Sequence, residues 1–148
     1  MTSELRKNSI SNPILVLKEW IGEARKSEIQ PNPNTMSIST VDSMGCPNSR
    51  MVLCKEINED LGYLVFYTNY NSKKSKEIAS HNDCSALFHW DPLGYQVRIL
   101  GKLIKSPIMK VIIIFLLGKR EANSQPGQVI KVIILKIVSH WIINFKRL

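Results

Sequence analysis

The stretch TMSISTVDSMGCPNSRMVLCKEI, residues 35–57, predicts a β-hairpin and so decides the class of fold. In residues 35–42 two sets of side chains alternate, which is typical of a strand with one buried face. The segment DSMGCP, residues 42–47, contains turn residues, and SRMVLCKEI, residues 49–57, predicts a second strand. Two strands joined by a short turn indicate an antiparallel sheet.

Further short strands are expected downstream of the hairpin, as far as Lys105. The segments YLVFYT (63–68), CSALFHW (84–90) and YQVRILGKLIK (95–105) are rich in aromatic and β-branched residues and are separated by turns. Together with the hairpin they give five strands and one intervening helix. This order predicts a mainly β fold with flanking helices (α+β), built around a small antiparallel barrel.

The regions on either side of the barrel differ in character. Residues 1–30 form an N-terminal helical segment, in which Asn12 and Pro13 begin an amphipathic helix that extends to residue 29. Residues 31–105 form the barrel core. Residues 106–148 are dominated by isoleucine and lysine, and their apolar runs fit a buried strand or a helix equally well.

Composition points to one globular domain with an anionic partner. The chain has 148 residues and a formal net charge of +8, which favours a nucleotide, a phosphorylated metabolite, a nucleic acid or a membrane surface. Three cysteines without a CxxC pair argue against a disulfide framework or a zinc site and favour the cytoplasm. The histidine spacing suggests no metal, and no signal peptide or apolar run long enough to span a bilayer is found.

Three lysines follow the predicted strand that ends at Thr68. Lys73, Lys74 and Lys76 fall in the first turn of a short helix, where the helix dipole favours acidic side chains instead. Backbone N–H groups and ammonium groups at such a position can share one phosphate. The alternative is a basic turn exposed to solvent.

The alternation of side chains along two predicted strands indicates which face of the sheet carries further polar and basic residues. Lys55 shares a face with Met51 and Leu53, which is a potential core face, and a lysine there either reaches solvent or holds an anion. In YQVRIL, residues 95–100, alternate residues look inward, so Gln96 and Arg98 lie on the opposite face.

At this point the sequence resembles the pyridoxamine 5′-phosphate oxidases, which are FMN enzymes of the split-barrel fold. The resemblance runs from Asn12 to Lys105 and depends on several motifs in one order. These motifs are NPILVLKEW, NTMSISTVD with its G-x-P turn, SRMVLCK, VFYTNYNSKK and QVRILGK. The resemblance implies an antiparallel FMN-binding split β-barrel.

The resemblance also implies site residues, although it identifies no catalytic residue. Lys73 and Lys74 match a pair that holds the FMN phosphate, and Lys55 is similar to a residue that touches both FMN and the substrate phosphate. The implied FMN contacts are Arg50, Met51, Val52, Leu53, Cys54, Lys55, Tyr67, Thr68, Lys73, Lys74 and Gln96. Beyond Lys105 the resemblance weakens to KREANSQPG, which puts Arg120 and Ser124 at substrate-phosphate positions.

The implied activity is FMN-dependent oxidation of pyridoxamine or pyridoxine 5′-phosphate to pyridoxal 5′-phosphate, with oxygen as acceptor, by a homodimer. The family's C-terminal part, with a flavin-contacting Trp and an Arg-x-His motif, has no counterpart here, so this part is truncated or degenerate. The alternative is therefore a flavin-binding split barrel without turnover. A nucleic-acid-binding barrel is disfavoured because the lysines are not interleaved with aromatic residues, and a membrane role for the tail is weaker still.

Overall fold

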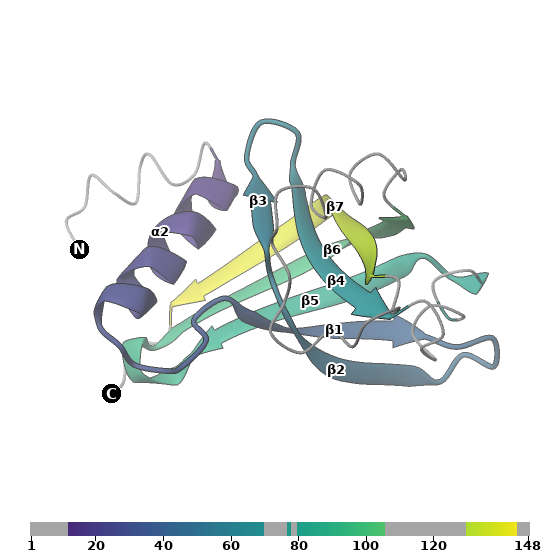
Figure 1. Ribbon diagram of the computed structural model, residues 1–148, viewed down its shortest axis with the longest axis horizontal. Coiled ribbons are helices and arrows are strands. Elements are labelled where there is room, and N and C mark those ends of the chain that lie inside the picture. The colour runs from purple at the N-terminus through teal and green to yellow at the C-terminus, as the bar shows by residue number, and fades with distance from the viewer. Residues whose placement is uncertain (1–11, 70–76, 78–79, 106–129, 145–148) are drawn as a thin grey trace.

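The described part of the chain is one antiparallel sheet with an α-helix lying across it (Figure 1). The computed structural model describes residues 12–69, 77, 80–105 and 130–144. Its elements are α2 (Pro13–Lys26), β1 (Thr35–Val41), β2 (Pro47–Leu53), β3 (Glu56–Asn58), β4 (Tyr63–Asn69), β5 (Asp83–Trp90), the 3-10 helix η1 (Asp91–Leu93), β6 (Tyr95–Lys105) and β7 (Ile130–Asn144). The prediction of a mainly antiparallel β fold is confirmed.

The first two strands form the hairpin predicted from the sequence. β1 and β2 pair antiparallel from Thr35 opposite Leu53 to Val41 opposite Pro47. In the turn, the carboxylate of Asp42 accepts hydrogen bonds from the backbone N–H groups of residues 44 and 46, both at 2.9 Å. Gly45 has a φ of 85°, a conformation that glycine adopts at little cost. The turn chemistry therefore sets the register of the pair.

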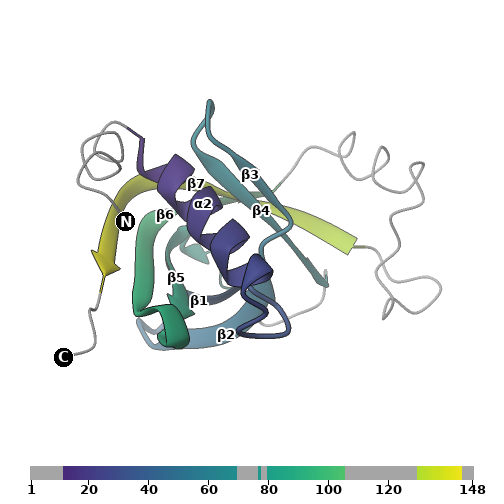
Figure 2. The same cartoon turned by 90° about the vertical axis from the view of Figure 1, so that its left-hand side faces the viewer.

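The strand predicted for residues 49–57 is two strands. β2 ends at Leu53 because the N–H of Cys54 donates to the carbonyl of Asn34 at 2.9 Å, while the N–H of Lys55 donates to the carbonyl of Val65 at 2.8 Å. Backbone pairing thus passes from β1 to β4 at this corner. The strand order is β2-β1-β5-β6-β7-β4-β3, so two residues join opposite edges of the sheet. This short link requires the sheet to curl, as Figure 2 shows.

β7 belongs to the same sheet as the strands of the predicted core. Its segment, which the sequence left open between strand and helix, pairs with β6 on one side and β4 on the other. Adjacent positions of this segment are apolar, as at residues 132–135, so its apolar run showed no clear period. Residues 106–129 and 145–148 of the predicted C-terminal segment lie outside the described residues.

The helix is attached by aromatic and aliphatic side chains on one face. Asn12 caps α2 by accepting a hydrogen bond from the N–H of Ile14 at 3.1 Å, as its position before Pro13 predicts. The helix ends at Lys26 rather than at residue 29. Trp20 stacks on Tyr95 of β6 with ring centroids 4.2 Å apart. The buried helix side chains are Val16, Leu17, Trp20, Ile21 and Ala24.

The core lies between α2 and the inner face of the curled sheet. Its largest buried side chains include Trp90, Phe66, Phe88, Met36 and Ile38. Among the described residues, none of the helices has the length and apolar character needed to cross a bilayer.

The sequence suggested that the face of β2 with Met51 and Leu53 looks into the core, but in the structure this face is the outer one. Met51 is 65% exposed, whereas Val52 packs against the core and Cys54 is buried. Arg50 shares this inner face, opposite the fully buried Ile38. β2 is an edge strand with apolar residues on both faces, so alternation alone did not identify the buried one. The inner face accepts Arg50 because a buried carboxylate partners it.

Candidate functional site

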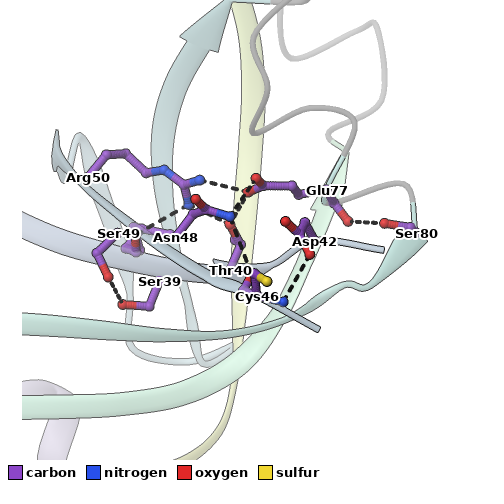
Figure 3. A network of polar contacts seen from close by, with 10 residues as sticks. Ser39, Thr40, Asp42, Cys46, Asn48, Ser49, Arg50, Glu77 and Ser80 are labelled. Atoms are coloured by element: carbon purple, nitrogen blue, oxygen red, sulfur yellow. Dashed lines mark hydrogen bonds and ion pairs between the residues drawn. The ribbon is translucent and has the colours of Figure 1, made fainter. Parts of the chain in front are cut away.

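Arg50 lies in a polar network that joins the hairpin to the segment after β4 (Figure 3). Its Nη2 donates to Oε2 of Glu77 at 2.7 Å, and its Nη1 donates to Oγ1 of Thr40 at 2.5 Å. The Thr40 hydroxyl donates to the same carboxylate oxygen at 2.6 Å. Nδ2 of Asn48 donates to the other oxygen, Oε1, at 3.0 Å. We call these four residues the Arg50 network.

The pairing of the hairpin strands explains why the network forms here. Thr40 is opposite Asn48, and Ile38 is opposite Arg50, so the polar side chains come from neighbouring positions of one sheet face. Thr40 continues the buried face of β1, but at its end a hydroxyl replaces the apolar side chains found earlier on that face. Its Oγ1 can accept from Arg50 and donate to Glu77 together.

Glu77 is the residue that sequence analysis missed. Its side chain is only 3% exposed, whereas that of Arg50 is 20% exposed. A buried carboxylate is tolerated where hydrogen bonds and an opposite charge replace its water, and Glu77 has all of these. The one available signal was a single acidic residue in the basic segment NSKKSKEI, residues 71–78, which does not distinguish a buried partner from a surface charge.

The guanidinium of Arg50 retains capacity to bind a further acceptor. Arginine has five N–H donors. The two Nη atoms serve Thr40, Glu77 and, at 3.4 Å, the carbonyl of Ile38. Its Nε–H and one Nη2 hydrogen have no acceptor among the residues that the structure describes. Such a pair of donors matches two oxygens of a phosphate.

Other predicted cofactor residues gather at the corner between β2 and β3. Nζ of Lys55 lies 6.0 Å from the centroid of the Tyr67 ring, a cation–π distance. Lys55 also lines a pocket of about 240 Å³ between α2 and this corner, together with Lys18 and Arg25. The pocket is not purely basic, because Glu56 also lines it and Nζ of Lys18 is paired with Glu59 at 2.8 Å.

Cys54 lines the same pocket but offers no nucleophile. Burial raises the pKa of its thiol to about 12, so the thiol is protonated near neutral pH. Among the described side chains, no three His, Cys, Asp or Glu residues gather as potential metal ligands.

Gln96 lies apart from the Arg50 network. In β6 the side chains of Val97 and Ile99 are buried, so Gln96 and Arg98 lie on the outer face, as predicted. Gln96 is opposite His89 of β5, and β5 and β1 separate it from β2. Arg50 and Gln96 therefore lie on opposite faces of the sheet within one chain.

Several predicted site residues cannot be placed. Lys73, Lys74, Arg120 and Ser124 lie outside the described residues, and so does the side chain of Thr68. The structure brings Arg50 to Glu77, and Lys55 to Tyr67.

Sequence comparison connects the chain to one family. A profile described as pyridoxamine 5′-phosphate oxidase matches residues 22–107, more than half of the 148 residues. The pyridoxine/pyridoxamine 5′-phosphate oxidase of Ruegeria sp. is 45% identical over 94 residues, which are 64% of this chain and 45% of that protein. The oxidase of Brucella canis is 47% identical over 96 residues, with the same two shares. The chain thus spans about half the length of the curated relatives it matches.

Solved structures share the fold at much lower identity. PhzG from Burkholderia lata, solved with tetrahydrophenazine-1-carboxylic acid, matches with a TM-score of 0.74 and 20% identity, covering 89% of this chain and 79% of that chain. A pyridoxamine 5′-phosphate oxidase-related, FMN binding protein from Nostoc punctiforme matches with a TM-score of 0.60 and 15% identity, covering 72% of each chain. The sheet described above is therefore the split barrel expected from the sequence.

Proposed function

The chain belongs to the pyridoxamine 5′-phosphate oxidase family, and on this premise we propose that it binds FMN and oxidises pyridoxamine or pyridoxine 5′-phosphate to pyridoxal 5′-phosphate. FMN, held by the basic residues named below, would supply two-electron redox chemistry with oxygen as the acceptor. The residues of this chain contribute binding and orientation, which bring the two reacting rings together.

The observation that carries this proposal is the ion pair between Arg50 and Glu77. Glu77, which binds Arg50, follows Lys74 by three residues. Three residues span at most about 11 Å, so chain length alone keeps the backbone of Lys74 near the Arg50 network. Three basic residues from two segments can then converge on one phosphate, which needs opposite charges and several donors.

The remaining residues of the proposed site lie along β2, at the corner after it and at the end of β4. The backbone of Met51–Cys54 would lie along the flavin, and Tyr67 with Thr68 would contact it at the end of β4. Lys55, which lines the corner pocket, would hold the substrate phosphate. Arg120 and Ser124 would complete that phosphate site.

A homodimer is part of the proposal because two of the proposed cofactor residues lie on opposite faces of the sheet within one chain. Gln96 lies on the outer face and Arg50 on the inner face of the same sheet. If Gln96 contacts flavin, a second copy can supply it. The outer face also carries exposed apolar side chains, including Met51 and Leu100, which a partner would cover.

A second candidate function is flavin binding without turnover. It is favoured by one observation: the match to the family profile ends at residue 107, so Arg120 and Ser124 lie beyond it. In that case FMN is retained while the substrate is not turned over.

Purified protein distinguishes these functions. We expect a yellow protein with about one FMN per chain, and aerobic conversion of pyridoxamine 5′-phosphate with matching release of peroxide. Bound FMN without conversion would select the second candidate. A colourless protein that takes up no FMN from solution would exclude both.

A further inference from the structure

We propose that Glu77 is a positioning residue for the cofactor phosphate: with Thr40 it fixes the guanidinium of Arg50 by its Nη atoms, so that the Nε edge is presented to a phosphate. This inference rests on the proposed function, because it deepens the FMN site by naming the group that orients it.

The first support is that the carboxylate is itself held rigidly. Among the described residues, three side chains donate hydrogen bonds to its two oxygens, and these donors, Thr40, Asn48 and Arg50, come from both strands of the hairpin. Thr40 closes a ring of contacts, because its Oγ1 accepts from Arg50 and donates to Glu77. An arginine side chain held at both Nη atoms loses most of its rotational freedom before a ligand arrives.

The second support is that the contacts use one end of the guanidinium. Thr40 and Glu77 occupy Nη1 and Nη2, while Nε–H and one Nη2 hydrogen have no acceptor among the residues in the described part of the chain. Arginine binds a phosphate through two parallel N–H groups. Glu77 therefore leaves a donor pair available and fixes its direction.

The third support concerns charge. An unpaired carboxylate beside a phosphate would repel it, but Glu77 is paired with Arg50 and accepts two further hydrogen bonds. Buried ion pairs add little net stability compared with apolar side chains of similar volume. The Arg50–Glu77 ion pair is therefore better explained by the orientation that it gives the guanidinium than by a gain in folding stability.

The test compares FMN with riboflavin, which has the same ring system but no phosphate. Dissociation constants for both are measured by flavin fluorescence for the unmodified protein, Glu77→Gln and Thr40→Val. We expect Glu77→Gln to weaken FMN binding by about tenfold or more, the usual effect of a lost charge-assisted hydrogen bond, and to leave riboflavin within about twofold. Thr40→Val keeps a branched side chain in the strand, so it tests the same point if Glu77→Gln does not fold.

Asp83→Asn is the matched control, since it removes the carboxylate of an exposed ion pair with Lys102 and should change neither constant. Equal weakening of FMN and riboflavin by the Glu77 and Thr40 variants, or no change in either, would mean that the network is only structural and would overturn this inference alone. If the unmodified protein binds FMN no better than riboflavin, the proposed phosphate site fails, and the inference fails with it.

Discussion

Nη2 of Arg50 lies 2.7 Å from Oε2 of Glu77, and this contact connects the edge strand β2 to the segment that follows β4. The two residues are 27 positions apart in the sequence. Arg50 is the one charged residue of β2, and it lies on the inner face of the split barrel. A single ion pair thus links the stability of the hairpin to the proposed phosphate site.

The first prediction concerns the stability of this pair. Arg50→Ala removes one ion-pair partner of the buried Glu77 carboxylate, to which Thr40 and Asn48 still donate. We expect the free energy of unfolding to fall by about 2–4 kcal/mol, below the upper end for fully buried pairs because Arg50 is partly exposed. Urea unfolding followed by circular dichroism measures it.

A double-mutant cycle separates the pair from its surroundings. Arg50→Ala with Glu77→Ala should destabilise the protein by about 1–3 kcal/mol less than the sum of the single changes. Lys102→Ala, which breaks an exposed ion pair with Asp83, should change stability by no more than about 0.5 kcal/mol. Strict additivity at Arg50 and Glu77 would contradict the coupling.

The second prediction concerns the lysines. Lys73→Ala with Lys74→Ala should raise the dissociation constant for FMN by about a hundredfold, because two charge-assisted contacts are lost. Riboflavin binding and the unfolding midpoint should stay unchanged. This pair is a cleaner probe than Arg50→Ala, which also removes the partner of Glu77.

Isothermal titration at two salt concentrations provides the measurement. The unmodified protein should bind FMN more weakly at high salt, and the double variant should have lost most of that dependence. If the double variant retains FMN as tightly as its parent, Lys73 and Lys74 do not hold the phosphate.

The sequence predicted those parts of the fold that depend on local pattern. Alternation identified the faces of β6, because a clear apolar set separates Val97 and Ile99 from Gln96 and Arg98. It failed at β2, where Met51 and Val52 are both apolar and only pairing with other strands decides which is buried. It also failed to divide β2 from β3, since that corner depends on backbone bonds to Asn34 and Val65, which are distant in sequence.

The candidate site shows the same division. Arg50 and Lys55 were named from a motif, and the structure places each beside a partner. Glu77 could not be named, because its burial results from how the segment after β4 meets the hairpin. A contact between distant segments leaves no periodic signal in a single sequence.

The third prediction concerns the cysteines. Burial raises the pKa of the Cys54 and Cys84 thiols to about 12, whereas Cys46 is exposed. A thiol reagent at pH 8 should therefore react rapidly with one of the three cysteines in the native protein and with all three in urea. Cys46→Ser should abolish the rapid phase, and a rapid phase that remains would place a second thiol at the surface.

The same pKa shifts predict a loss of stability at alkaline pH. Both thiols hold their protons more tightly in the folded state than in the unfolded state, where the pKa is near 9. Their contribution is complete below pH 9 and is lost as the pH rises from 9 toward 12, by about 1.4 kcal/mol per pH unit for each thiol. Urea unfolding at pH 8 and pH 10 measures the loss. Cys54→Ala should make this loss smaller, and an identical loss in that variant would contradict the assignment to Cys54.

The last prediction concerns the proposed second copy. Met51 is 65% exposed on the outer face of β2, in register with Ser37 of β1, which in turn is opposite Leu87 of β5. Placing a charge there should disfavour any partner that covers this face, because the carboxylate would be buried without a counter-ion. We expect Met51→Glu to be a monomer by light scattering at a concentration where the parent is a dimer.

The variant should also lose bound flavin, since Gln96 and Arg50 lie on opposite faces of one chain and would meet at one cofactor only through the dimer. Leu61→Glu is the matched control, because Leu61 is 70% exposed and lies in the turn before β4. This substitution should change neither the molar mass in solution nor the flavin content. A monomeric Met51→Glu protein that keeps its full FMN would show that one chain completes the site. In that case Gln96 does not contact the flavin, because Arg50 and the Met51–Cys54 backbone would then hold FMN without a second copy.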